Sequence, residues 1–187
     1  MYFLNDISND IQFTHLRFNR YSTSLKLVLG AIFAGLAAIF QSAGGFFPGV
    51  GYLASPLATA PILLCFIVSV WTGTLSYFLT CLLLLVLQPS ELIVFPFTTG
   101  LLGFGLGLAF CFFKKRLAII LLGGVFLTVG IAALLYVFRF PVLGPAISLS
   151  FSIITLGGVF IFAFLYTWGW VEASIIFFKR FKNTIPW

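Results

Sequence analysis

Long apolar runs make up most of the chain, and short breaks rich in polar residues, glycine or proline separate them. The stretch 52–88 contains no charged residue. As one helix its 37 residues would be about 55 Å long, nearly twice the roughly 30 Å hydrocarbon core of a bilayer. It therefore predicts a helical hairpin that turns within residues 69–74, where glycine, small hydroxyl residues and a tryptophan coincide. Together the apolar runs predict six membrane spans, at residues 25–43, 52–69, 72–88, 92–113, 117–138 and 146–176.

Composition supports this interpretation, because 61% of the 187 residues are hydrophobic and 7% are charged. A soluble domain carries about 25% charged residues. We therefore expect an all-α integral membrane protein with one domain, a bundle of six transmembrane helices over residues 25–180. A basic tail, residues 177–187, follows the last span. The polar leader, residues 1–24, fits either a short interfacial helix or a disordered segment.

The distribution of positive charge predicts the orientation of the bundle. Six spans place both termini on one side of the membrane, and with that side inside, the inner segments hold nine of the ten cations. The tenth cation, Arg139, falls outside. This arrangement explains the net charge of +6 without a nucleic-acid partner. The nine inner cations are Arg17, Arg20, Lys26, Lys114, Lys115, Arg116, Lys179, Arg180 and Lys182.

Catalytic and metal-binding chemistry finds little support in the sequence. The single histidine, His15, lies in the leader, the chain has four carboxylates, and no phosphate-binding loop motif occurs. We therefore expect no enzymatic activity, no metal site and no cofactor. Cysteines 65, 81 and 111 are interpreted as apolar packing residues, and Glu172 as an anchor at the inner interface.

Polar side chains gather where the spans reach the outer side. Glu91 and Arg139 are the two charges expected there, and nearby aromatic residues would suit a small, flat, polar ligand. Two explanations stay open for these outer polar residues. They can form a solute site, or the charges can be solvated in loops while the hydroxyls bond backbone carbonyls and hold neighbouring helices together. The candidate solute-binding residues are Gln88, Glu91, Thr98, Thr99, Tyr136, Arg139, Ser148 and Ser152.

The first span carries all its small residues on one side. Gly30, Ala34 and Ala38 form one ridge, and Ala31 and Gly35 form the adjacent one. Small residues at this spacing let a second helix approach closely within lipid. That second helix can belong to the same bundle or to a partner protein.

Several of these features together resemble the substrate-binding S component of energy-coupling factor (ECF) vitamin transporters. They are the small face of the first span after a basic residue, the Phe-Pro-Gly loop at 47–49 and six spans with both ends inside. The segments 60–62, 88–91 and 97–103 resemble in particular S-component-like proteins of Gram-positive bacteria, and the resemblance covers about residues 25–180.

The resemblance implies a multi-pass subunit of the bacterial cytoplasmic membrane that captures a vitamin-like solute from outside. A separate transmembrane coupling protein and two ATPases would then drive transport, with the coupling protein docking on Gly30, Ala34 and Ala38. A small stand-alone carrier or channel, and a membrane scaffold that binds no solute, are the alternatives. The sequence does not identify the ligand.

Overall fold

The computed structural model describes residues 21–47, 49–140 and 152–184, and in this part of the chain every regular element is a helix. Six helical segments are long and apolar enough to cross a membrane, so the chain is an all-α multi-pass membrane protein, as predicted. The leader up to residue 20 and the predicted start of the sixth span at residue 146 lie outside the described residues.

Three of the six segments are single helices, and three are composite, with short 3-10, α or π turns that extend an α-helix at its outer end. The sixth is the longest. Their bounds are α2 Thr23–Phe46; α3 Gly51–Ala54, η2 Ser55–Ala58 and α4 Thr59–Val68; α5 Val70–Leu87; α6 Glu91–Val94, η3 Phe95–Phe97 and α7 Thr99–Phe112; α8 Arg116–Ala132 and η4 Ala133–Val137; and α9 Ile153–Thr184.

The uncharged run forms the predicted hairpin, and a single extended residue, Ser69, separates α4 from α5. Its amide donates a hydrogen bond to the Cys65 carbonyl (3.0 Å), and its own carbonyl accepts one from the Gly73 amide (2.9 Å). A side chain at Gly73 would collide with the ring of Phe66. Glycine at this position therefore lets α5 return directly alongside α4.

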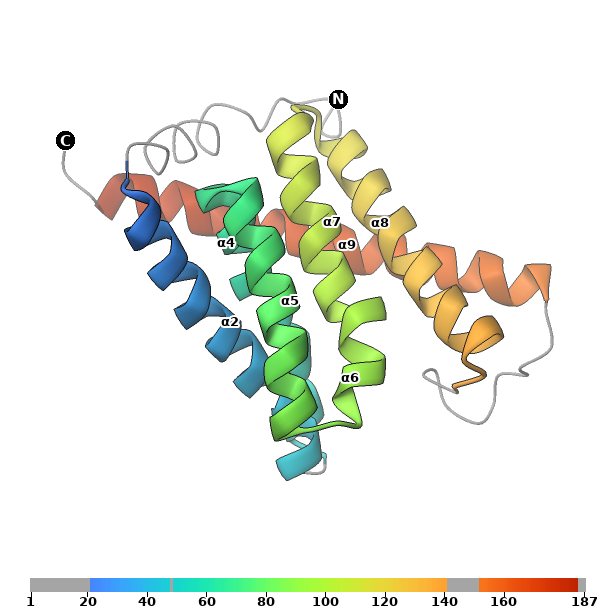
Figure 1. Cartoon of the computed structure of the whole chain (residues 1–187). Helices are drawn as coiled ribbons and strands as arrows, with labels where there is room; N and C mark the ends of the chain where they lie inside the picture. Colours follow the sequence, from blue (N-terminus) through green and yellow to red (C-terminus); the bar gives the residue numbers. More distant parts are fainter. Residues whose placement is uncertain (1–20, 48, 141–151, 185–187) are drawn as a thin grey trace.

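The ends of the helices divide the bundle into two poles. The starts of α2 and α8 lie at the same end as the ends of α4 and α7 (Figure 1). The predicted inner cations lie there: Lys26 is near the start of α2, Arg116 begins α8, and Lys114 and Lys115 lie between α7 and α8. We call this the inner end, following the positive-inside expectation. The opposite, outer end holds the start of α3 and Glu91 at the start of α6.

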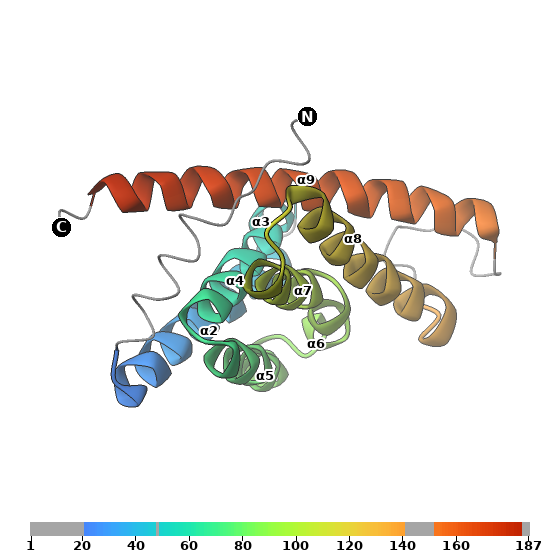
Figure 2. The same ribbon diagram turned by 90° about the horizontal axis from the view of Figure 1, so that it is seen from above.

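Helix α9 lies crosswise over one face of the other helices (Figures 1 and 2). Its 32 residues make it about 48 Å long, well beyond the roughly 30 Å hydrocarbon core. A helix of that length must tilt to keep its apolar side chains within lipid. It packs mainly against α8, where Thr167 lies beside Gly123.

Two apolar clusters form the interior. The larger one joins α4, α7, α8 and α9, and the smaller one joins α2, α4 and α5 with η3 around Phe66 and Phe95. Helices α4 and α7 approach closely, because a side chain on Gly103 or Gly107 would collide with Thr59, Ile62 or Phe66. Tight packing of small residues against aromatic rings thus holds the centre of the bundle together.

The structure corrects the prediction that Gly30, Ala34 and Ala38 offer a free docking face. All three residues are buried inside the bundle, where α2 packs against α5 and α4. The hydroxyl of Ser76 donates a hydrogen bond to the Gly30 carbonyl (3.1 Å), and that of Thr80 donates one to the Ala34 carbonyl (3.3 Å). This ridge therefore packs against other helices of the same bundle.

An ion pair between Arg116 and Glu172, 3.2 Å apart, ties the inner end of α8 to α9. Glu172, predicted as an interfacial anchor, thus acts in a contact between helices. Both side chains are mostly covered, at 16% and 27% exposure.

We expect Arg116→Gln to lower the free energy of unfolding by about 1–3 kcal/mol, because it leaves the Glu172 carboxylate without its charged partner. Thermal unfolding in detergent, followed by circular dichroism, measures this change. Lys115→Gln is the matched control, since Lys115 is exposed and adjacent. Equal midpoints for the two variants would contradict a stabilising role for the pair.

Candidate functional site

A cavity of about 490 Å³ opens at the outer end, between the start of α3, the α6–α7 segment, α8 and α9. Its lining combines polar groups with apolar and aromatic side chains. The polar residues are Gln41, Tyr52, Ser55, Glu91, Thr98, Thr99 and Tyr166, and the apolar ones are Pro56, Val94, Leu127, Ile131, Phe140 and Phe162.

A chain of hydrogen bonds, the Gln41 cluster of Gln41, Glu91 and Thr99, forms the polar wall of this cavity. The Thr99 hydroxyl donates to Oε1 of Gln41 (2.6 Å), and Nε2 of Gln41 donates to Oε2 of Glu91 (2.7 Å). The two bonds fix the orientation of the Gln41 amide, with its oxygen toward Thr99 and its nitrogen toward Glu91. Residues far apart in the sequence, on α2, α6 and α7, are thereby brought together.

Neighbouring hydroxyls hold the Gln41 cluster in place. The Ser55 hydroxyl donates to the Gln41 carbonyl (3.2 Å), and the Thr59 hydroxyl donates to the Thr99 carbonyl (3.2 Å). Gln41 is only 2% exposed, yet its amide oxygen and nitrogen both have partners. Because each bond satisfies a polar group that would be costly to bury alone, the cluster is a preorganised polar surface.

Aromatic side chains form another part of the lining. Phe162 and Tyr166, one turn apart on α9, stack with ring centroids 5.8 Å apart and planes 15° apart. Phe140 follows the end of α8, and Tyr52 lies on α3 with 61% of its surface exposed. The cavity therefore offers flat aromatic surfaces together with hydrogen-bonding groups.

Three of the candidate residues from the sequence line this cavity: Glu91, Thr98 and Thr99. Glu91 and Thr99 belong to the Gln41 cluster. Thr98 directs its hydroxyl to the Val94 carbonyl (2.8 Å), which leaves it a minor contributor to the polar wall.

The remaining candidates are not brought together with them. Gln88 ends α5 and donates to the Ser90 hydroxyl (3.1 Å), and Ser152 accepts a hydrogen bond from the Thr155 amide (3.4 Å) at the start of α9. Tyr136 packs against the larger apolar cluster. None of the three is in the cavity lining, and Ser148 lies outside the described residues.

Glu91 and Arg139, the two charges expected on the outer side, are also not brought together. Arg139 is exposed, adopts a left-handed backbone conformation with φ of 52°, and is not among the described lining residues. These two described residues make no ion pair with each other. Glu91 is bound by the Gln41 amide instead.

Gln41, at the centre of the site, is the residue that sequence reasoning missed. A buried amide near the end of an apolar span was the available signal, because such a group requires polar partners within the bundle.

In the described part of the chain, no group of three or more His, Cys, Asp or Glu side chains could hold a metal ion. The arrangement can bind a small molecule through hydrogen bonds and stacking. Comparison of the chain with models of protein families, with curated proteins and with solved structures gives no match.

Proposed function

We propose that this chain is the solute-capturing membrane subunit of an ECF-type transporter in a bacterial cytoplasmic membrane. The cavity with its Gln41 cluster carries the proposal. Its volume of about 490 Å³ falls in the range of small-molecule sites, about 300–1,000 Å³. A vitamin-like solute would enter from outside and bind between the polar wall and the aromatic side chains.

Transport would need partners that supply energy, because the sequence holds no phosphate-binding loop. In the proposal these are a transmembrane coupling protein and two ATPases, and the chain by itself carries out no catalysis. Purified protein in liposomes should then retain solute without moving it. Transport by the protein alone would identify a stand-alone carrier, and the absence of any bound solute or partner would identify a scaffold.

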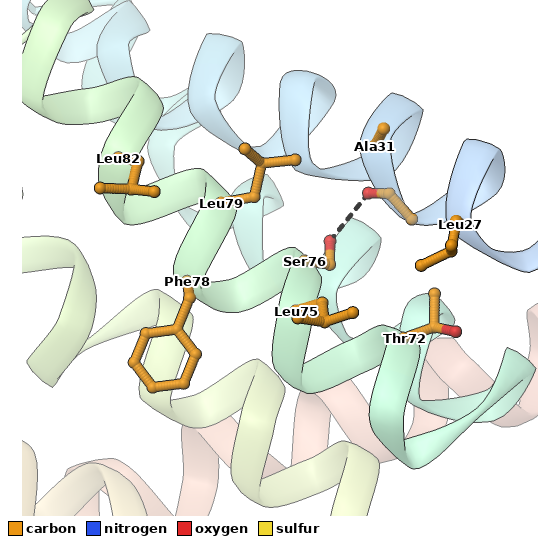
Figure 3. A pocket seen from close by; sticks show the side chains of 9 residues that line it. Leu27, Ala31, Thr72, Leu75, Ser76, Phe78, Leu79 and Leu82 are labelled. Carbon is orange, nitrogen blue, oxygen red and sulfur yellow. Dashed lines mark hydrogen bonds between the residues drawn. The ribbon is translucent and has the colours of Figure 1, made fainter.

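The second small ridge of α2 is the surface we propose for the coupling protein. Ala31 is exposed, and a Cβ atom added at Gly35 would meet nothing within 4 Å. A groove of about 340 Å³ runs beside Ala31 between α2 and α5 (Figure 3), and its lining is nearly all apolar. A partner helix could approach here without displacing α5.

Replacing Gln41 with leucine should reduce the amount of retained solute at least tenfold. The change removes both hydrogen bonds of the amide. Each contributes about 1 kcal/mol or more, and the bond to the Glu91 carboxylate contributes the larger share. Mass spectrometry of small molecules released from protein purified out of native membranes measures the effect.

Gln88→Leu is the matched control, since it makes the same change outside the cavity. It should retain solute like the unaltered protein. Equal retention by both variants would place the binding site elsewhere.

A further inference from the structure

The charge of the cavity points to a class of ligand. Of the described residues that line it, Glu91 alone carries a formal charge. The segment 141–151, which follows Phe140 in the chain, contains no charged residue in its sequence. Among the described residues, a single carboxylate therefore sets the charge of this cavity.

The hydrogen bonds around Glu91 leave it with unused capacity to accept. Gln41 donates to Oε2, whereas Oε1 has no hydrogen-bond partner among the described residues. The donors of the Gln41 cluster all run toward the carboxylate: Thr99 donates to Gln41, and Gln41 donates to Glu91. A bound molecule therefore meets an acceptor here, and its own N–H groups would complete the site.

Among the described residues, no positively charged side chain lines the cavity or forms an ion pair with Glu91. Arg139, the other charge expected on the outer side, neither lines the cavity nor pairs with Glu91. A carboxylate in contact with an apolar cavity is stabilised by a positive partner, because such surroundings solvate its charge poorly. An anionic ligand would instead be repelled.

The aromatic lining favours the same charge. A cation over the face of a Tyr or Phe ring gains about 0.5–2 kcal/mol, and a flat ligand adds stacking. The stacked pair of Phe162 and Tyr166 and the exposed ring of Tyr52 belong to the same cavity as Glu91.

We infer that the solute is a small, flat organic cation, such as an amidinium or a protonated amino-heterocycle. Its N–H groups bind Oε1 and Oε2 of Glu91, and its ring packs against Phe162, Tyr166 and Tyr52. This inference rests on the proposed function, since it names the ligand class of the same cavity.

Benzamidinium, benzamide and benzoate test the inference, because they share one ring and differ in charge. Calorimetric titration of the purified full-length protein should give benzamidinium at least tenfold tighter binding than benzamide, and no binding of benzoate. Glu91→Gln should remove the preference for benzamidinium. Arg139→Gln, which removes the other outer charge, should leave the preference unchanged.

Equal binding of benzamidinium and benzamide, or a preference for benzoate that Arg139→Gln removes, would overturn the cation inference. The three-probe comparison on the unaltered protein gives this answer even where Glu91→Gln fails to fold. A neutral or anionic solute found in protein purified from native membranes would also overturn it, while supporting capture. Failure of all three probes, with no solute recovered, would overturn both the inference and the proposed function.

Discussion

Gly130→Ala is expected to prevent recovery of most of the protein as a folded, monodisperse species. A methyl group at this position of α8 would collide with the carbonyl oxygen of Phe97 and with the side chain of Leu101. The Phe97 carbonyl oxygen belongs to the backbone and cannot rotate away, so α8 or the η3 turn must shift. Such overpacking typically lowers the free energy of unfolding by about 1–3 kcal/mol, and occasionally by more. Size-exclusion chromatography and thermal unfolding in detergent measure the loss.

The same substitution should disturb the cavity in whatever protein survives. Ile131 and Thr98, which directly follow Gly130 and Phe97 in the chain, both line the cavity. Any shift that relieves the collision therefore moves lining residues, so solute retention should fall along with stability.

Gly157→Ala is the matched control, because a side chain at Gly157 of α9 meets nothing within 4 Å. Alanine is favoured over glycine within a helix by roughly 0.5–1 kcal/mol, so the variant should be at least as stable as the unaltered protein. Equal stability of the Gly130 and Gly157 variants would show that α8 does not pack against η3 as closely as the structure has it.

The architecture was predictable because membrane physics limits the choices. An uncharged run of 37 residues is too long for one crossing and requires a turn, and Ser69 supplies it inside the predicted segment. The crosswise course of α9 was not predictable, since hydropathy gives the length of a helix and not the neighbours against which it tilts.

The site was only partly predictable, because its residues meet through tertiary contacts. Polarity at the outer ends pointed to Glu91 and Thr99, but Gln41 lies 50 positions from its partner Glu91. Arg139 was included because it is the second charge expected on the outer side, but it is not among the described residues that line the cavity. Its left-handed backbone changes the direction of the chain there, and residue spacing does not reveal such a change.

The small ridges of α2 show a different limit. Sequence spacing identified both ridges and did not tell which one α5 covers. A signal was nevertheless present: Thr72, Ser76 and Thr80 repeat every four residues on α5, at the same spacing as Gly30, Ala34 and Ala38. Hydroxyls opposite small residues are typical of helix contacts within membranes, and these form the observed interface.

Gly35→Leu should abolish co-purification with the coupling protein while leaving the monomer folded. Gly35 lies on the uncovered ridge, where an added Cβ atom would meet nothing within 4 Å. A leucine there would keep a partner helix from close approach, which is the main source of helix affinity in lipid. Pull-down of the tagged protein in mild detergent, with quantification of the membrane partner and ATPases, should show at least a tenfold loss.

Gly30→Leu provides the comparison that separates docking from folding. Its side chain would begin 2.7 Å from the Thr72 methyl group, within the buried α2–α5 contact. Since that contact holds the bundle together, this variant should lose thermal stability as well as partners. If Gly35→Leu kept its partners, the uncovered ridge would not be the docking surface. If Gly35→Leu instead unfolded like Gly30→Leu, the ridge would be a packing surface, and the coupling protein would have to bind another face of the bundle.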